Sequence, residues 1–143
     1  MTYTMPNPIL APVVVLVLWT LVMLVWLYAL RIPAIRRVRL PLDPNRSKED
    51  FFAALPPSTR WPADNYAHLL EQPTIFYAIA LTLVLLGHGG GLNADLAWLY
   101  VALRIIHSLV QATVNAILVR FWLFIASSVV LAVLALRAAI IVF

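Results

Sequence analysis

The amino-acid sequence predicts an all-α integral membrane protein, a four-transmembrane-helix bundle with up-down topology. The first observation is composition: 64% of the 143 residues are hydrophobic, only 11% are charged, and there is no cysteine. A water-soluble domain of this size could not cover so much apolar surface. The second observation is that windows of about 20 apolar residues, the length that crosses a bilayer, occur four times, at 9–30, 66–86, 96–118 and 121–143. We therefore expect one domain over residues 1–143, with the lipid bilayer as its partner.

The first span, 9–30, is expected to stay in the protein as a helix, because it has neither a basic n-region nor a small-residue cleavage site. The loop that follows, 31–64, holds most of the cations: Arg31, Arg36, Arg37, Arg39, Arg46, Lys48 and Arg60. Under the positive-inside rule this loop is cytoplasmic and both termini lie outside. The net charge of +4 is thus a topology signal, and no nucleic-acid partner is expected. A short helix near 47–55, capped by Ser47, is also predicted within the loop.

The second span carries three ionisable side chains on one helical face, because Asp64, His68 and Glu71 are separated by four and three residues. Pro73 follows them and has no backbone N–H, which leaves the carbonyl of Leu69 without its helical partner. Inside a membrane such a carbonyl needs another donor. We expect a side chain, a water or a ligand to supply it.

The third span carries a polar stripe. Separations of three, four and four residues place all its members on one helical face: Arg104, His107, Gln111 and Asn115. Ionisable groups are costly within a bilayer, so the stripe is predicted to face a functional interior. From the helical rise, Arg104 and Glu71 reach similar depths in the membrane, and we predict that they form an ion pair.

The fourth span begins beside Arg120, which the charge distribution places at the cytoplasmic face. An electropositive entrance suits an anionic ligand, so we expect a polar cavity that opens toward the cytoplasm. Near the other end of this span, Arg137 is expected to snorkel to the outer interface. His68 and His107 have Glu71 as the single nearby carboxylate, so no metal site is predicted.

Two segments also carry a resemblance. Span two contains Glu71-Gln72-Pro73-Thr74-Ile75-Phe76-Tyr77, and span three contains Arg104-Ile105-Ile106-His107, followed thirteen residues later by Arg120. Together they resemble the membrane-associated proteins in eicosanoid and glutathione metabolism, the MAPEG family, and in particular its bacterial members. The resemblance covers about residues 60–140. It implies a four-helix bundle in the inner cell membrane that assembles as a homotrimer and binds glutathione between subunits on the cytoplasmic side.

The resemblance also implies roles for the matching residues. Those that would hold glutathione are Glu71, His68, Arg104, His107 and Gln111. Two of these, His68 and Gln111, stand where catalytic relatives commonly have Asn and Tyr. Arg120 would be the catalytic residue, because a cation beside a thiol favours the reactive thiolate. A first-span arginine of the family corresponds to Arg31, Arg36 or Arg37.

The predicted function is a membrane-bound glutathione-dependent transferase or peroxidase. Its second substrate would be a lipophilic electrophile, a small molecule that enters from the bilayer. Two alternatives come from other function classes. Glu71 and His107 would be the proton-coupling groups of a small transporter, since such groups build proton relays. In a non-catalytic assembly or lipid-binding protein, the polar stripe would only specify how subunits pack.

Overall fold

The structure is a computed structural model that describes residues 7–38, 45 and 47–143. All regular secondary structure in these residues is helical: α1 (Leu10–Val38), α2 (Lys48–Ala53), α3 (Pro57–Leu69), α4 (Gln72–Leu85), α5 (Leu92–Thr113) and α6 (Ile117–Val142). Four segments are long and apolar enough to cross a membrane, namely α1, α3 together with α4, α5, and α6. This confirms the predicted all-α, four-helix membrane fold.

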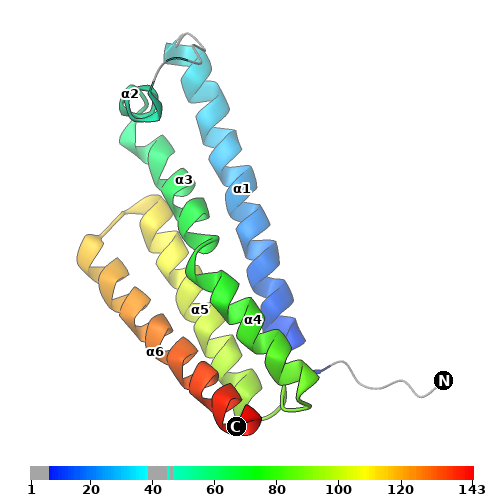
Figure 1. The fold of residues 1–143 in the computed structure, drawn as a ribbon. Coiled ribbons are helices and arrows are strands. Elements are labelled where there is room, and N and C mark those ends of the chain that lie inside the picture. Colours follow the sequence, from blue (N-terminus) through cyan, green and yellow to red (C-terminus); the bar gives the residue numbers. More distant parts are fainter. Residues whose placement is uncertain (1–6, 39–44, 46) are drawn as a thin grey trace, which may run out of the picture.

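The helices run alternately up and down, so the start of α1 and the end of α6 lie at the same end of the bundle (Figure 1). At the opposite end, α1 and α3 extend beyond the α5–α6 connection, and α2 lies beside the far end of α1. Helix α5 is the central helix, because it contacts α1, α3 and α6. Its apolar window is 44% buried, against 22–28% for the other three spans. Most of the buried polar residues in the described part of the chain accordingly lie on α5.

The helices at the basic end are longer than the sequence predicts. Helix α1 continues past Leu30 to Val38 with Pro33 inside it, and α3 begins at Pro57. Proline suits the first turn of a helix, where its missing N–H has no helical partner to lose. The predicted loop 31–64 is therefore largely helical in the described residues. Ser47 is confirmed as the cap of α2, because its Oγ accepts the backbone N–H of Asp50 at 3.1 Å.

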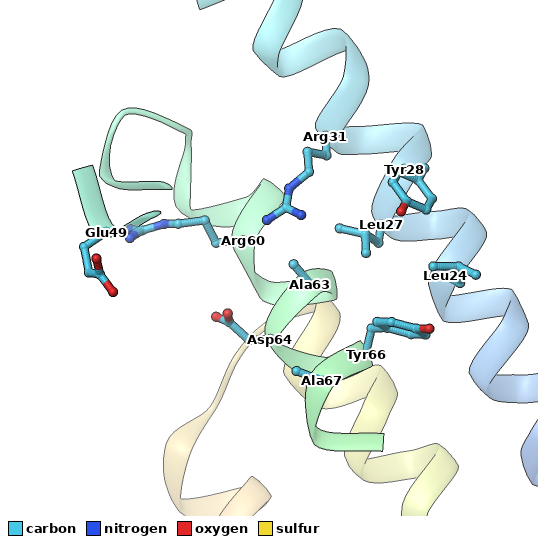
Figure 2. A pocket seen from close by; sticks show the side chains of 10 residues that line it. All are labelled: Leu24, Leu27, Tyr28, Arg31, Glu49, Arg60, Ala63, Asp64, Tyr66 and Ala67. Atoms are coloured by element: carbon cyan, nitrogen blue, oxygen red, sulfur yellow. The ribbon is translucent and has the colours of Figure 1, made fainter. Parts of the chain in front are cut away.

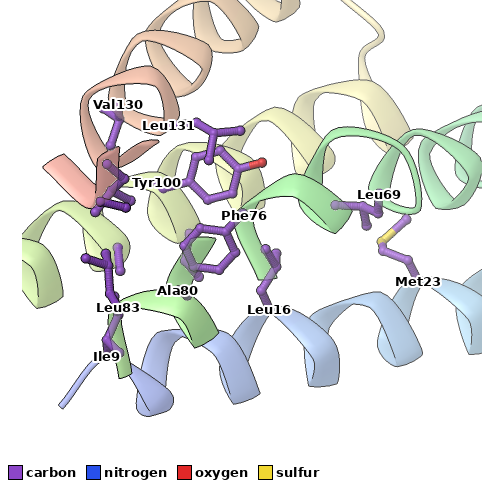
Figure 3. Close-up of a cluster of buried hydrophobic side chains, with 14 of the residues drawn as sticks. Ile9, Leu16, Met23, Leu69, Phe76, Ala80, Leu83, Tyr100, Val130 and Leu131 are labelled. Carbon is purple, nitrogen blue, oxygen red and sulfur yellow. The ribbon is translucent and has the colours of Figure 1, made fainter. Parts of the chain in front are cut away.

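A continuous apolar core holds the bundle together (Figure 3). Ile9, in the turn just before α1, and Leu16 and Met23 on α1 contribute a stripe at heptad spacing. Opposite it, the rings of Phe76 on α4 and Tyr100 on α5 stack with their centroids 4.6 Å apart. Aromatic pairs of this kind stabilise beyond the area they bury. The core thus fixes α4 against α5 and leaves the polar residues of α5 one to three turns away.

Asn93, in the first turn of α5, links the α4–α5 connection to α6. The side-chain amide of Asn93 donates to the carbonyl of His88 at 2.7 Å. Arg137 donates from Nε to Asn93 Oδ1 at 2.5 Å, and its predicted snorkelling to the outer interface stays a prediction. Asn93 does not cap α5 with its side chain, and the N-cap residue is Gly91. A buried amide on a neighbouring helix thus gives this cation a partner within the protein.

Gly89 provides a first test of this arrangement. The backbone N–H of Ile9 donates to its carbonyl at 3.0 Å, and a Cβ on Gly89 would lie 2.0 Å from Oδ1 of Asn7. Nothing lies within 4 Å of the matched position on Gly90. We expect Gly89→Ala to lower the free energy of unfolding by about 1 kcal/mol relative to Gly90→Ala, measured in detergent micelles. Equal stabilities would contradict the docking of Asn7 on this turn.

Candidate functional site

The site is organised around a break in the second span, between the end of α3 at Leu69 and the start of α4 at Gln72. Pro73 lies at the start of α4 and donates no backbone hydrogen bond. Helix α3 closes with a tight turn from the Leu70 N–H to the Ala67 carbonyl, and the next carbonyl along the chain belongs to His68. Nη2 of Arg104 donates to the His68 carbonyl at 2.9 Å. A side chain thus supplies a donor at the break, to His68, and the donor expected for the carbonyl of Leu69 stays a prediction.

The predicted ion pair between Glu71 and Arg104 is wrong. Arg104 is fully buried, and the hydrogen bonds of its guanidinium within the described chain go to the carbonyl and the ring of His68. Glu71 is exposed and is the N-cap residue of α4. The cation thus lies at the negative C-terminal end of α3 and the carboxylate at the positive N-terminal end of α4. Each charge is therefore stabilised by the dipole of a helix end. These two ends exist because the second span is interrupted, and the sequence did not predict that interruption.

The polar stripe of α5 is buried as predicted over three of its four positions. Arg104, His107 and Gln111 are 0%, 2% and 4% exposed. Asn115 lies beyond the end of α5, with a φ of +51°. Its backbone N–H donates to the Val110 carbonyl at 2.7 Å, so it closes the helix in the left-handed conformation that glycine and asparagine adopt most readily. The placement of Asn115 on the helical stripe was therefore wrong.

His68 and His107 form the centre of the site. Their rings stack with centroids 5.1 Å apart and planes 17° from parallel. Phe124 of α6 meets the His68 ring edge-on at 5.3 Å, and its own ring lies 5.9 Å from the guanidinium carbon of Arg104. Sequence reasoning missed Phe124, although its position four residues after Arg120 places both on one face of α6. Among the described residues, no group of three His, Cys, Asp or Glu side chains is placed to hold a metal ion.

The side chain of Gln111 forms a hydrogen bond with a buried side chain of α3. Its Oε1 accepts from Nδ2 of Asn65 at 2.9 Å, and Asn65 Oδ1 accepts from the hydroxyl of Ser108. All three residues of this cluster, which we call the amide cluster, are buried. It joins α3 to α5 one turn from the two histidines. Sequence reasoning missed Asn65 and Ser108, and the signal that could have found them is their spacing of three from His68 and from Gln111.

Arg120 lies in the first turn of α6 and is partly buried. Its Nη1 donates to Oδ1 of Asn115. The N-terminal end of a helix carries partial positive charge, so the helix adds to the field of the guanidinium. Arg120 and the N-terminal end of α6 therefore form a region of positive potential, in which Asn115 fixes the orientation of the Arg120 side chain.

A cavity of about 670 Å³ lies at the same end of the bundle, between α1, α2 and α3. Figure 2 shows Arg31 on α1 reaching toward α3, and Arg60 on α3 reaching toward Glu49 on α2. Asp64 also lines the cavity, whereas His68 does not. Of the three candidate first-span arginines, Arg31 is the one that lines this cavity.

Comparison with known proteins agrees with the geometry. No curated protein and no solved structure matches the chain. The MAPEG family model matches residues 9–140, which is nearly the whole chain and includes every residue of the site described above. Four membrane-spanning helices and this match establish an integral multi-pass membrane protein that belongs to the MAPEG family.

Proposed function

We propose that this protein is a membrane-bound, glutathione-dependent transferase with peroxidase-like capacity, acting on lipophilic electrophiles. Family membership supports a glutathione-related role at the level of the family. The observation that carries the proposal for this chain is Arg120, a partly buried cation at a helix N-terminus with its side chain held by Asn115. A cation fixed in this way favours the thiolate of a bound thiol over the neutral form. Because the chain has no cysteine, the thiol comes from the substrate.

The residues proposed to bind glutathione fall into two groups, one accessible to a ligand and one buried. Glu71 is exposed and His68 is partly buried, so both could contact the tripeptide directly. Arg104, His107 and Gln111 are buried, and we propose that they hold His68 and the α3–α4 break in position. The cavity lined by Arg31, Arg60 and Asp64 offers cations for the carboxylates of glutathione and a carboxylate for its ammonium group.

We further propose a homotrimer in the inner cell membrane, with glutathione bound between subunits on the cytoplasmic side and both termini outside. The arginines at the α2 end of the bundle support this orientation, because basic residues collect on the cytoplasmic side of membrane proteins. The N-terminal end of α1 and the C-terminal end of α6 lie at the opposite end (Figure 1). The lipophilic substrate would enter from the bilayer.

The proposed function is tested by titrating purified protein with glutathione while following thiolate absorbance. We expect the wild type to form thiolate near neutral pH, Arg120→Ala to lose it, and Arg120→Lys to retain part of it because the charge remains. Conjugation of a generic aromatic electrophile should follow the same order. Calorimetry that detects no glutathione binding by the wild type, together with no conjugation, would overturn the proposal.

A further inference from the structure

The hydrogen bonds between Arg104 and His68 determine where the proton of the imidazole ring lies. Nη2 of Arg104 is 2.9 Å from the His68 carbonyl oxygen and 3.0 Å from the ring atom Nδ1. A guanidinium nitrogen donates hydrogen bonds and has no lone pair available to accept one. Each of the two hydrogens on Nη2 therefore meets one acceptor of the same residue. Nδ1 must then be unprotonated, and the ring proton of His68 lies on Nε2.

The surroundings keep the ring neutral and leave Nε2 available. The positive charge of Arg104, whose Nη2 is 3.0 Å from Nδ1, disfavours a positive charge on the ring of His68. Nε2 of His68 has no hydrogen-bond partner in the part of the chain that the structure describes. His68 is only partly buried, whereas Arg104 behind it is fully buried. The residue thus offers a single N–H donor on the side away from the arginine.

We propose that Arg104 locks His68 in the Nε2–H tautomer, and that His68 thereby serves as a fixed hydrogen-bond donor to an anionic group of bound glutathione. The ligand part of this proposal rests on the proposed function, whereas the tautomer does not. In this assignment Arg104 is a positioning residue, and it acts through His68 without touching the ligand. Both hydrogens of Nη2 are used by His68, whereas Nε and Nη1 of Arg104 are buried without a hydrogen-bond partner among the described residues.

The tautomer is measured directly by nitrogen NMR of the full chain, labelled with ¹⁵N-histidine in detergent micelles without ligand. The protein contains three histidines, and the signals of His68 are identified by their loss in His68→Asn. At about pH 8, where an unperturbed imidazole is neutral, we expect an unprotonated Nδ1 and a protonated Nε2. A proton on Nδ1, an even mixture of both tautomers, or a doubly protonated ring would overturn the proposal.

The Arg104→Met variant removes the donor while keeping an unbranched side chain. We expect the His68 signals to shift toward a mixture of tautomers in this variant. If Arg104→Met does not fold, the wild-type spectrum decides the tautomer by itself. An unchanged spectrum in a folded Arg104→Met variant would show that Arg104 does not set it.

The role toward the ligand is tested by calorimetry with glutathione. His68→Asn keeps a side-chain N–H donor, and we expect its affinity to stay within a few-fold of the wild type. His68→Phe keeps a ring for stacking but has no donor, and its affinity should fall about 10- to 100-fold. Wild-type affinity in His68→Phe would overturn the donor role. If the wild type binds no glutathione, the proposed function and the donor role fail together, and the spectrum still decides the tautomer.

Discussion

Replacing Asn65 by leucine is expected to lower the free energy of unfolding by about 2 kcal/mol, although leucine is the more hydrophobic residue. Asn65 is fully buried and bonds Gln111 at 2.9 Å and the hydroxyl of Ser108. Leucine would leave both partners buried without hydrogen bonds. An unsatisfied buried polar group costs more than the net gain from the bond it made. Thermal unfolding in detergent should show a midpoint about 5 °C lower.

The control for this prediction removes the partners as well. The triple variant Asn65→Leu, Gln111→Leu, Ser108→Ala has no stranded polar group in the amide cluster, so it should recover most of the lost stability. Thr113→Ala removes an exposed hydroxyl on α5 that bonds only within its own helix, and it should change little. If the triple variant is no more stable than Asn65→Leu, the cost does not come from unsatisfied groups.

Substitutions of Asn115 should separate its two roles, one in the backbone and one toward Arg120. Asn115→Gly keeps the positive φ of 51° but removes the amide that holds Arg120. Asn115→Ala also removes the amide, but it leaves a Cβ in the left-handed conformation without the polar side chain that helps asparagine adopt it, which relative to glycine costs about 1–2 kcal/mol. We expect Asn115→Gly to unfold near the wild-type midpoint and Asn115→Ala clearly below it.

Both variants should nonetheless affect glutathione alike, since in both Arg120 is no longer held in one orientation. The fraction of bound glutathione present as thiolate near neutral pH should fall about 10-fold in each, measured by absorbance. Asn115→Asp is the matched variant that keeps an acceptor and adds a charge. Its carboxylate would neutralise Arg120 and reduce the thiolate further. Wild-type thiolate in Asn115→Gly would show that the amide does not position Arg120.

Much of the fold could be predicted from the sequence, because hydrophobic composition and periodicity act locally. The apolar windows located the four spans, and the polar spacing on α5 correctly identified Arg104, His107 and Gln111 as buried. The cap at Ser47 followed from a short-range pattern in the same way. The contribution of each assigned residue to glutathione binding stays a prediction.

The two incorrect placements, those of Asn115 and Glu71, have one cause: the helices end at positions that the sequence pattern did not predict. Asn115 was assigned to a helix that ends at Thr113. Glu71 was assigned to the face of His68, but the break at Leu70 turns it out of that helix. Both assignments assumed a continuous helical period. Pro73 and Asn115 are signals for these ends, but the exact end residues depend on how the last turns close.

Composition and spacing along the chain suffice to predict a four-helix membrane protein of the MAPEG family and the burial of Arg104, His107 and Gln111 on α5. Burial could be predicted because the cost of exposing apolar groups to water, or ionisable groups to lipid, depends on residue type and spacing. The partners of these residues could not be predicted in this way and come from the packing of the helices: Arg104 with His68, Gln111 with Asn65, and both histidines with Phe124. Hydrogen bonds act over about 3 Å, so their partners depend on where helices end and cross, and the packing of the whole bundle sets those positions.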